Sequence, residues 1–126
     1  MIFNTSTLPH RLPLVIYCIL IFVQSSFPSL EALPSFPFSD KLMHLGGYAL
    51  LGALAVRDFK RQFKDKSRLS ITICAIAFST FYGATDEFHQ SFVAGRSADL
   101  MDLLADFAGS VAGAWIFWRD IPYIDY

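Results

Sequence analysis

Four long apolar segments dominate the sequence and limit what the chain can fold into. They cover about residues 12–27, 42–56, 69–88 and 99–118. A helix that crosses the hydrocarbon of a bilayer needs roughly 20 apolar residues, with a range of about 17–25. Backbone groups in lipid have to be satisfied within the protein, so spanning segments are expected to be helices. The sequence therefore predicts an all-α membrane protein, with residues 1–126 forming one domain that is a bundle of four transmembrane helices.

The composition agrees with this prediction. Hydrophobic residues make up 54% of the chain and charged residues 17%, against about 45–50% and about 25% in soluble domains. Such a chain has too little polar surface to cover a water-soluble globule. The lipid bilayer is therefore the expected environment, and a net charge of -1 gives no reason to expect a nucleic-acid partner.

The first apolar segment has a second interpretation. A basic residue, Arg11, precedes its apolar core, as in a secretory signal peptide. A cleavage site needs small residues at alternating positions after the core, whereas Phe27 and Pro28 stand there. Retention as the first transmembrane helix is favoured, and cleavage is the alternative.

Basic residues predict how the bundle is oriented. The chain has ten Lys and Arg residues, and six lie between the second and third apolar segments: Arg57, Lys60, Arg61, Lys64, Lys66 and Arg68. Short loops rich in Lys and Arg stay in the cytoplasm. By alternation, both termini are inside (N-in/C-in), and the connections 28–39 and 88–98 face outward. Aromatic belts are expected at the two interfaces, formed by Trp115, Trp118 and Tyr123 inside and by Phe36 and Phe38 outside.

With this topology, polar side chains from three segments gather at the outward end of the bundle. They are Asp40, Lys41, His44, Tyr48, Asp86, Glu87, His89, Gln90, Arg96, Asp99, Asp102 and Asp106. Residues three or four apart share a helix face. The stripe Asp99, Asp102 and Asp106 therefore continues through Gly109 and Gly113, a small-xxx-small pair that favours close helix packing. The carboxylates of this stripe are expected to face the bundle interior.

Carboxylates at membrane depth are a functional-site hypothesis by default, but structural roles compete with it. Asp99 is suited to cap a helix, and Asp102 to pair with Arg96 or Lys41. Tyr48 is expected to serve packing, and His89 is a candidate for a solvated loop residue. Acids outnumber the fixed cations at this end, so some carboxylates are expected to be protonated or to recruit a cation. A divalent metal is possible and is not required.

Two stretches carry a resemblance to a known family. The sequences "DKLMHLGGYALLG" and "DEFHQSFVAGRSADLMDLLADFAGSVAG" resemble the two signatures of the VanZ-like family of bacterial integral membrane proteins. The resemblance covers about residues 25–113. The motif positions are Asp40, Lys41, His44, Tyr48, Asp86, Glu87, Gln90, Arg96, Asp102, Gly109 and Gly113. A departure is Asp106, where the family commonly has Asn.

The resemblance implies a multi-pass protein of the bacterial cytoplasmic (inner) membrane with its polar site facing outward. The family's namesake is associated with low-level resistance to the glycopeptide antibiotic teicoplanin. The first hypothesis is therefore a protein of the cell envelope that binds a lipid-linked cell-wall precursor or a glycopeptide-type ligand. The expected ligand-binding residues are Asp40, Lys41, Tyr48, Gln90, Arg96, Asp102 and Asp106.

The second hypothesis is a membrane-embedded hydrolase or transferase that acts on a lipid head group. Here His44 is a general base or nucleophile and Glu87 a general acid, with Asp86 as a third candidate catalytic residue. The third hypothesis is an ion-coupled carrier that uses Asp102 and Asp106. It is disfavoured, because the inner halves of the segments read as wholly apolar. The oligomeric state is left open.

Overall fold

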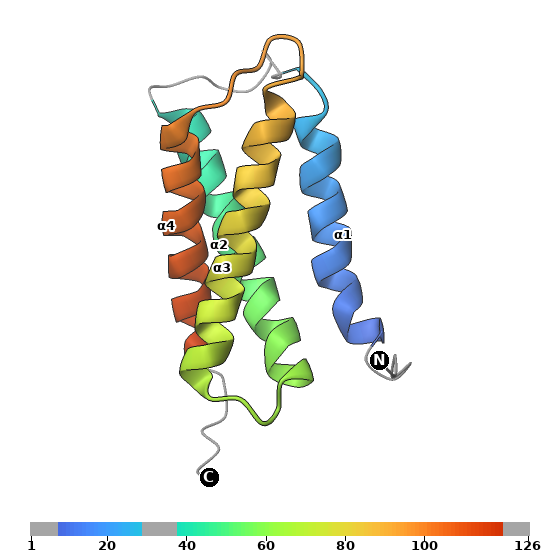
Figure 1. Ribbon diagram of the computed structural model, residues 1–126, viewed down its shortest axis with the longest axis vertical. Helices are drawn as coiled ribbons and strands as arrows, with labels where there is room; N and C mark the ends of the chain where they lie inside the picture. Colours follow the sequence, from blue (N-terminus) through green and yellow to red (C-terminus); the bar gives the residue numbers. More distant parts are fainter. Residues whose placement is uncertain (1–7, 29–37, 120–126) are drawn as a thin grey trace.

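A computed structural model of the chain describes residues 8–28 and 38–119, and this part consists of four helices with no strand (Figure 1). The helices are α1 (Leu8–Ser25), α2 (Ser39–Gln62), α3 (Arg68–Gln90) and α4 (Leu100–Trp118). They run up and down beside one another, so that the connection between α3 and α4 lies at one end of the bundle. The connection between α2 and α3 lies at the other end (Figure 1). The all-α prediction is confirmed.

Side-chain caps explain where two of the helices begin. Ser67 precedes α3, and its hydroxyl accepts a hydrogen bond from the backbone N–H of Ser70 at 3.1 Å. Asp99 precedes α4, and its Oδ1 accepts one from the N–H of Met101 at 2.9 Å. Such caps satisfy donors that the first turn of a helix leaves unpaired. The capping role predicted for Asp99 is confirmed.

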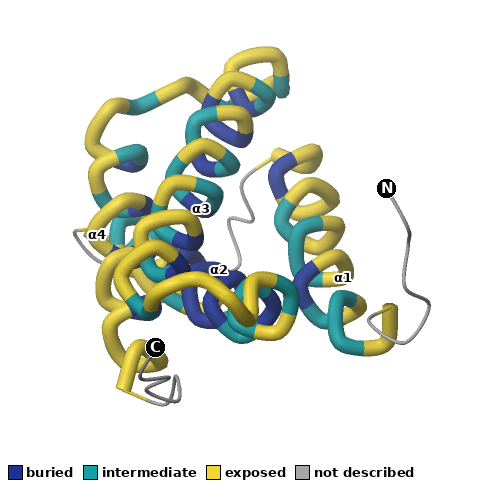
Figure 2. Tube along the Cα trace, turned by 60° about the horizontal axis from the view of Figure 1, so that its bottom comes forward, coloured by how far each residue is buried: buried dark blue, intermediate teal, exposed yellow. Residues whose placement is uncertain are grey.

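The second helix is longer and more central than its apolar segment suggests. It extends beyond the predicted segment 42–56 at both ends and includes the polar residues that flank this segment. Figure 2 shows that α2 carries much of the buried surface, whereas α1 at the edge is mostly exposed or half-buried. The closest helix pair is α2 with α4, and α1 packs mainly against α2 and α3. The helices α2, α3 and α4 therefore form the centre of the molecule, with α1 against one side.

Glycines set the distance between α2 and α4. A Cβ atom built on Gly109 or Gly113 would collide with the backbone of Leu45 or Ala49. A Cβ atom on Gly52 would lie 2.6 Å from the carbonyl oxygen of Ser110. The close packing predicted from Gly109 and Gly113 is confirmed, and the stripe that bears Asp102 and Asp106 faces α2.

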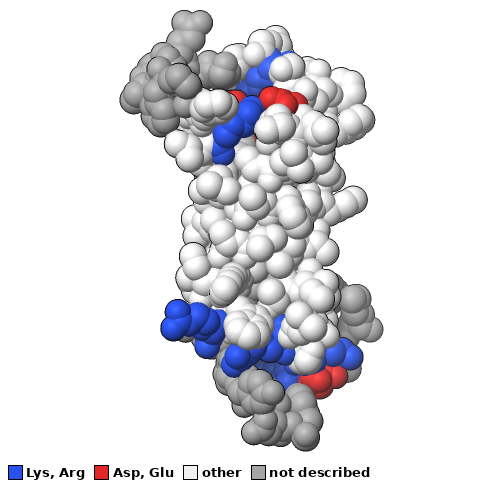
Figure 3. Space-filling model, turned by 90° about the vertical axis from the view of Figure 1, so that its left-hand side faces the viewer, with Lys and Arg blue, Asp and Glu red and all other residues white. Residues whose placement is uncertain are grey.

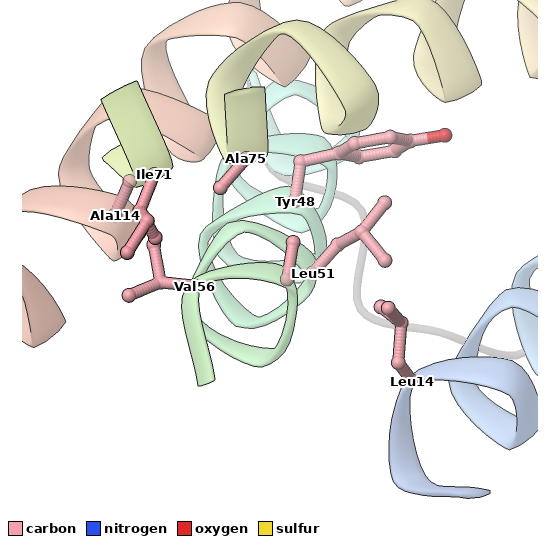
Figure 4. Packing of buried hydrophobic residues seen from close by; sticks show 8 residues of the cluster. Leu14, Tyr48, Leu51, Val56, Ile71, Ala75 and Ala114 are labelled. Atoms are coloured by element: carbon pink, nitrogen blue, oxygen red, sulfur yellow. The ribbon is translucent and has the colours of Figure 1, made fainter. Parts of the chain in front are cut away.

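The buried core is small and mostly aliphatic, with Tyr48 as its aromatic member, and half-buried rings such as Phe59 and Phe78 pack against it. Figure 4 shows Leu51, Val56, Ile71 and Ala75 packed between the helices, with the Tyr48 hydroxyl pointing away from these side chains. Tyr48 is 3% exposed, so the packing role predicted for it is confirmed. Its hydroxyl also has a partner, described below.

The outer surface of the bundle is apolar over most of its length. Large hydrophobic side chains such as Ile16, Phe81 and Ile116 are exposed, and Figure 3 shows an uncharged belt between two charged ends. Among the described residues, α1, α3 and α4 are long and apolar enough to cross a membrane. The helix α2 does not meet this criterion, because charged residues lie near both of its ends. The fold is therefore that of a multi-pass membrane protein with three candidate spans.

Two of the predicted interfacial aromatic residues lie near the end of α4. Trp115 and Trp118 are exposed, and the guanidinium of Arg68 lies 4.7 Å from the ring centroid of Trp118. Phe38 is exposed at the start of α2. The other two predicted members, Phe36 and Tyr123, lie outside the described residues.

Candidate functional site

A polar cavity of about 560 Å³ lies at the end of the bundle where α1 ends and α2 and α4 begin. Four helices and the connection between α3 and α4 contribute to its wall. The predicted site residues that line it are Asp40, His44, Tyr48, Asp86, Gln90, Arg96 and Asp102. The remaining ones, Lys41, Glu87 and Asp106, contact these residues directly. The structure thus brings the predicted residues together, in three groups.

The first group is the lysine cluster, formed by Lys41, Asp40, Asp99 and Asp102. The Lys41 Nζ lies 2.9 Å from Asp40 Oδ2, 2.8 Å from Asp99 Oδ2 and 2.5 Å from Asp102 Oδ1. The pairing predicted between Lys41 and Asp102 is therefore present. Hydrogen bonds from the Lys41 ammonium and from the Met101 N–H hold the pKa of Asp99 below its ordinary value. This cluster joins the first turn of α2 to the start of α4.

The second group is the His44 cluster, formed by His44 on α2, Glu87 on α3 and Asp106 on α4. The Nδ1 of His44 lies 2.7 Å from Asp106 Oδ1 and 3.9 Å from Glu87 Oε1. Its other nitrogen, Nε2, lies 3.7 Å from Asp102 Oδ2. Glu87 and Asp106 are 6% and 0% exposed. Three helices therefore direct one imidazole and two buried carboxylates to a common point.

The third group is the Asp86 network, formed by Asp86, Ser25, Tyr48 and Gln90. The Ser25 hydroxyl donates to Asp86 Oδ1, the Tyr48 hydroxyl to Asp86 Oδ2 at 3.1 Å, and the Gln90 amide to Asp86 Oδ2 at 3.2 Å. All four residues are buried. Hydrogen bonds from three side chains stabilise the buried Asp86. The network also attaches the end of α1 to α2 and α3.

Arg96 is the exception among the charged residues of this end. It follows Gly95 in a tight turn closed by a hydrogen bond from the Arg96 N–H to the Val93 carbonyl at 3.1 Å. Gly95 has a φ of 78°, which a residue with a side chain rarely adopts. Within residues 8–28 and 38–119 the Arg96 guanidinium forms no ion pair, and its buried Nε has no hydrogen-bond partner. Arg96 therefore presents an unmatched cation to the cavity.

Two residues near the site were placed differently by sequence reasoning or missed by it. His89 is not in a loop: it lies in the last turn of α3, stacks on Phe22 and lies 3.0 Å from the Ser26 hydroxyl. Ser25 was not singled out, and its only signal in the sequence is its position at the end of the first apolar segment. These contacts hold α1 against α3.

Sequence reasoning also missed a buried acid at the opposite end. Asp58 is 3% exposed; its Oδ2 accepts a hydrogen bond from Gln62, and Arg11 Nε lies 3.9 Å away. The segment predicted to end at residue 56 continues as a helix to Gln62, so Asp58 is a buried helical residue rather than part of a charged connection. Asp58 also borders an apolar gap of about 730 Å³ between α1, α2 and α3. It lies outside the polar cavity and shares no contact with the three groups described above.

Comparisons with known proteins identify the family of the chain. The family described as VanZ/LLP1 matches residues 10–121, which include all four helices apart from the first residues of α1. The chain is also 30% identical, over 96 residues, to the uncharacterized protein C11E3.10 of Schizosaccharomyces pombe. That match covers 76% of this chain and 56% of the yeast protein, so the chain spans about half the length of this relative. No solved structure matches the chain significantly. The chain belongs to the VanZ/LLP1 family.

Proposed function

We propose that this protein lies in the cytoplasmic (inner) membrane and binds the head group of an anionic amphiphile in its polar cavity. The observation that carries the proposal is the Arg96 guanidinium, which forms no ion pair with the described residues and lies in the wall of a cavity of about 560 Å³. A guanidinium offers a planar fork of donors that suits phosphate and carboxylate groups. The carboxylates and amides around it suit hydroxyl and amine groups of the same head group. A lipid-linked cell-wall precursor and a glycopeptide have this mixture of groups.

The orientation that we propose for the protein is consistent with a ligand of this class. In our proposal α2 spans the bilayer as a fourth helix, since it packs against each of the other three helices. The basic residues of the connection 57–68 then lie in the cytoplasm. Both termini are cytoplasmic, and the polar cavity opens to the outside. Retention of α1 in the mature protein is favoured, because Ser25 completes the Asp86 network.

Cysteine labelling tests the orientation. Ser97→Cys lies in the connection between α3 and α4, and Lys64→Cys lies between α2 and α3. In intact cells a membrane-impermeant maleimide is expected to label the first variant and to reach the second after permeabilisation. The two native cysteines, Cys18 and Cys74, are replaced by Ala in both variants. The reverse labelling pattern would refute the outward-facing cavity.

Binding tests the ligand class. We expect the purified full chain in detergent to bind a polyprenyl pyrophosphate, and Arg96→Ala to weaken this binding. A hydrogen-bonded charge contributes about 1.5–3 kcal/mol, which corresponds to a loss of roughly 10- to 100-fold in affinity. Arg119→Ala, at the opposite end of α4, is the matched control and is expected to bind normally.

Teicoplanin and phosphatidylglycerol vesicles distinguish the finer ligand classes in the same assay. The yeast relative favours a head-group chemistry that is not confined to bacterial cell walls. A folded protein that binds none of these three probes would contradict the proposal. An equal loss in Arg96→Ala and Arg119→Ala would contradict the role of the cavity.

A second candidate function, hydrolysis or transfer at a lipid head group, is supported by the His44 cluster. An imidazole held 2.7 Å from a buried carboxylate is the arrangement of an oriented general base. Glu87 is placed to act as the acid. In this case His44→Ala retains head-group binding and loses turnover of the bound lipid. If His44→Ala supports the same turnover as the unmodified protein, the enzymatic mechanism is excluded.

A further inference from the structure

The His44 cluster has the geometry of a metal-binding site. Its three possible ligand atoms, one from each residue, lie within 4.8 Å of one another. Metal–ligand distances of about 2.0–2.2 Å place the ligands of one ion roughly 3–4 Å apart. The separation from His44 Nδ1 to Glu87, 3.9 Å, lies within this range, and the separation to Asp106, 2.7 Å, lies just below it. Small side-chain shifts would therefore place all three atoms around one ion.

Two buried oxygen atoms of the cluster lack a hydrogen-bond partner within the described part of the chain, which is a second and independent argument for a bound ion. Glu87 Oε1 and Asp106 Oδ2 are buried, and neither has a hydrogen-bond partner among the described residues. Their residues are 6% and 0% exposed, so water is largely excluded. A buried carboxylate oxygen without a partner is costly, and both of these atoms lie in the cluster. The helix α3 approaches Asp106 Oδ2 closely at Gly83. A Cβ atom built on Gly83 would lie only 2.8 Å from this oxygen.

The surroundings provide the second contacts that metal ligands usually have. The Nε2 of His44 faces Asp102 Oδ2 at 3.7 Å, and Asp102 is held in turn by Lys41. The other oxygen of Glu87, Oε2, accepts a hydrogen bond from the Asp99 backbone N–H at 3.0 Å. In metal sites the histidine ligand commonly donates its remaining N–H to a carboxylate, and carboxylate ligands are themselves hydrogen-bonded. Glu87 has this second hydrogen bond, and Asp102 lies at ion-pair distance from the remaining nitrogen of His44.

The charge of the cluster also fits a divalent cation. The ammonium of Lys41 bonds Asp40, Asp99 and Asp102 rather than Glu87 or Asp106. A protonated His44 would match one of the two buried negative charges, whereas a divalent ion matches both and leaves His44 neutral. Burying unmatched charge is strongly unfavourable, so an ion of charge two would complete the site.

We propose that His44, Glu87 and Asp106 bind one divalent transition-metal ion in the wall of the polar cavity. One imidazole nitrogen with two carboxylates suits Zn²⁺ or Mn²⁺, whereas Mg²⁺ and Ca²⁺ prefer ligand sets made of oxygen. His44 and Asp102 line the cavity, so the ion keeps a position open to water or to a ligand in the cavity. The site does not depend on Arg96, so it can be tested separately from head-group binding; because it uses His44 and Glu87, it is an alternative to their proposed roles as base and acid.

Calorimetry with the metal alone tests this assignment. The full chain is purified in detergent, treated with a chelator, and titrated with Zn²⁺, Mn²⁺ and Mg²⁺. We expect one Zn²⁺ or Mn²⁺ ion per chain and much weaker binding of Mg²⁺. His44→Ala and Glu87→Gln are each expected to weaken binding by more than about 100-fold, because loss of a residue that only supports a ligand already costs about 10- to 100-fold. The matched control is His89→Ala, which removes an imidazole at the same end of the bundle but outside the cluster. It is expected to bind the ion normally.

X-ray absorption at the metal edge of the unmodified protein gives a readout that needs no variant. We expect one nitrogen from imidazole and carboxylate oxygens in the inner coordination sphere. The proposal is overturned if no ion binds, if Mg²⁺ binds as tightly, if His89→Ala matches His44→Ala, or if the spectrum lacks imidazole. Arg96→Ala is expected to bind the ion normally while losing the amphiphile, which separates this proposal from the previous one.

Discussion

Replacement of Gly113 by Ala tests the central contact of the fold. The added Cβ atom would lie 2.6 Å from the carbonyl carbon of Ala49 and 2.9 Å from its Cα, inside the 3.0 Å that real Cβ atoms respect. These atoms belong to the backbone of α2, so the helices have to separate by on the order of 1 Å. A gap of this size removes a quarter to a half of each van der Waals attraction across the contact. We expect a loss of about 1–3 kcal/mol in the free energy of unfolding.

Gly46→Ala is the matched control for this prediction. Gly46 lies on α2, and a Cβ atom there meets nothing within 4 Å. Alanine is favoured over glycine in a helix by roughly 0.5–1 kcal/mol, so this variant is expected to be neutral or stabilised. The difference between the two variants is then about 1–4 kcal/mol. Unfolding by sodium dodecyl sulfate in mixed micelles, followed by far-UV circular dichroism, measures it. Equal stability of the two variants would show that α2 and α4 do not approach this closely.

Three further variants address the polar end. Lys41→Met leaves the Asp102 side chain, which is 10% exposed, without its cation. We expect a loss of about 2–3 kcal/mol in the same unfolding assay, and an unchanged stability would contradict this pairing. Ser25→Ala removes a hydrogen bond to the buried Asp86 and is expected to cost about 1–2 kcal/mol; a neutral effect would mean that α1 is held by its apolar contacts. Asp99→Asn tests pH dependence. Because Lys41 lowers the pKa of Asp99, its stabilising effect is present at neutral pH and is lost as pH falls through the lowered pKa. The variant keeps a cap and should therefore lose less stability between about pH 5 and pH 2, and a parallel pH profile would refute this.

Much of the fold was predictable because the relevant signals are local. Runs of apolar residues predicted the helices, and the spacing of Asp99, Asp102, Asp106 and Gly109 predicted which face of the last helix packs inward. Both signals depend on residues that lie only a few positions apart along the chain. The length of α2 was not predictable in the same way, because its polar ends carry no apolar signal.

The candidate site was predictable as a set of residues but not as a set of pairs. Helical spacing places Lys41 and His44 near the same end as the carboxylates, but it does not set how far each helix is rotated. Lys41 therefore could pair with any of several acids, and the structure assigns it Asp40, Asp99 and Asp102. Asp58 was missed for a related reason: among basic neighbours it resembles a solvated surface residue, and its burial depends on the position of α1.

The attachment of α1 has a consequence for how the molecule is assembled. Ser25 and its partner Asp86 are 61 residues apart, so their contact is unavailable until α3 has been synthesised and inserted. The helix α1 leaves the ribosome before α2, α3 and α4, and it has to remain without this contact until α3 is in place. The apolar surface of α1 is mostly exposed in the structure. Lipid can therefore cover this surface at little cost before α3 is in place. The helices α2, α3 and α4 follow one another along the chain and share the closest contacts. The helix that precedes the other three along the chain is therefore the one whose polar attachment is completed late.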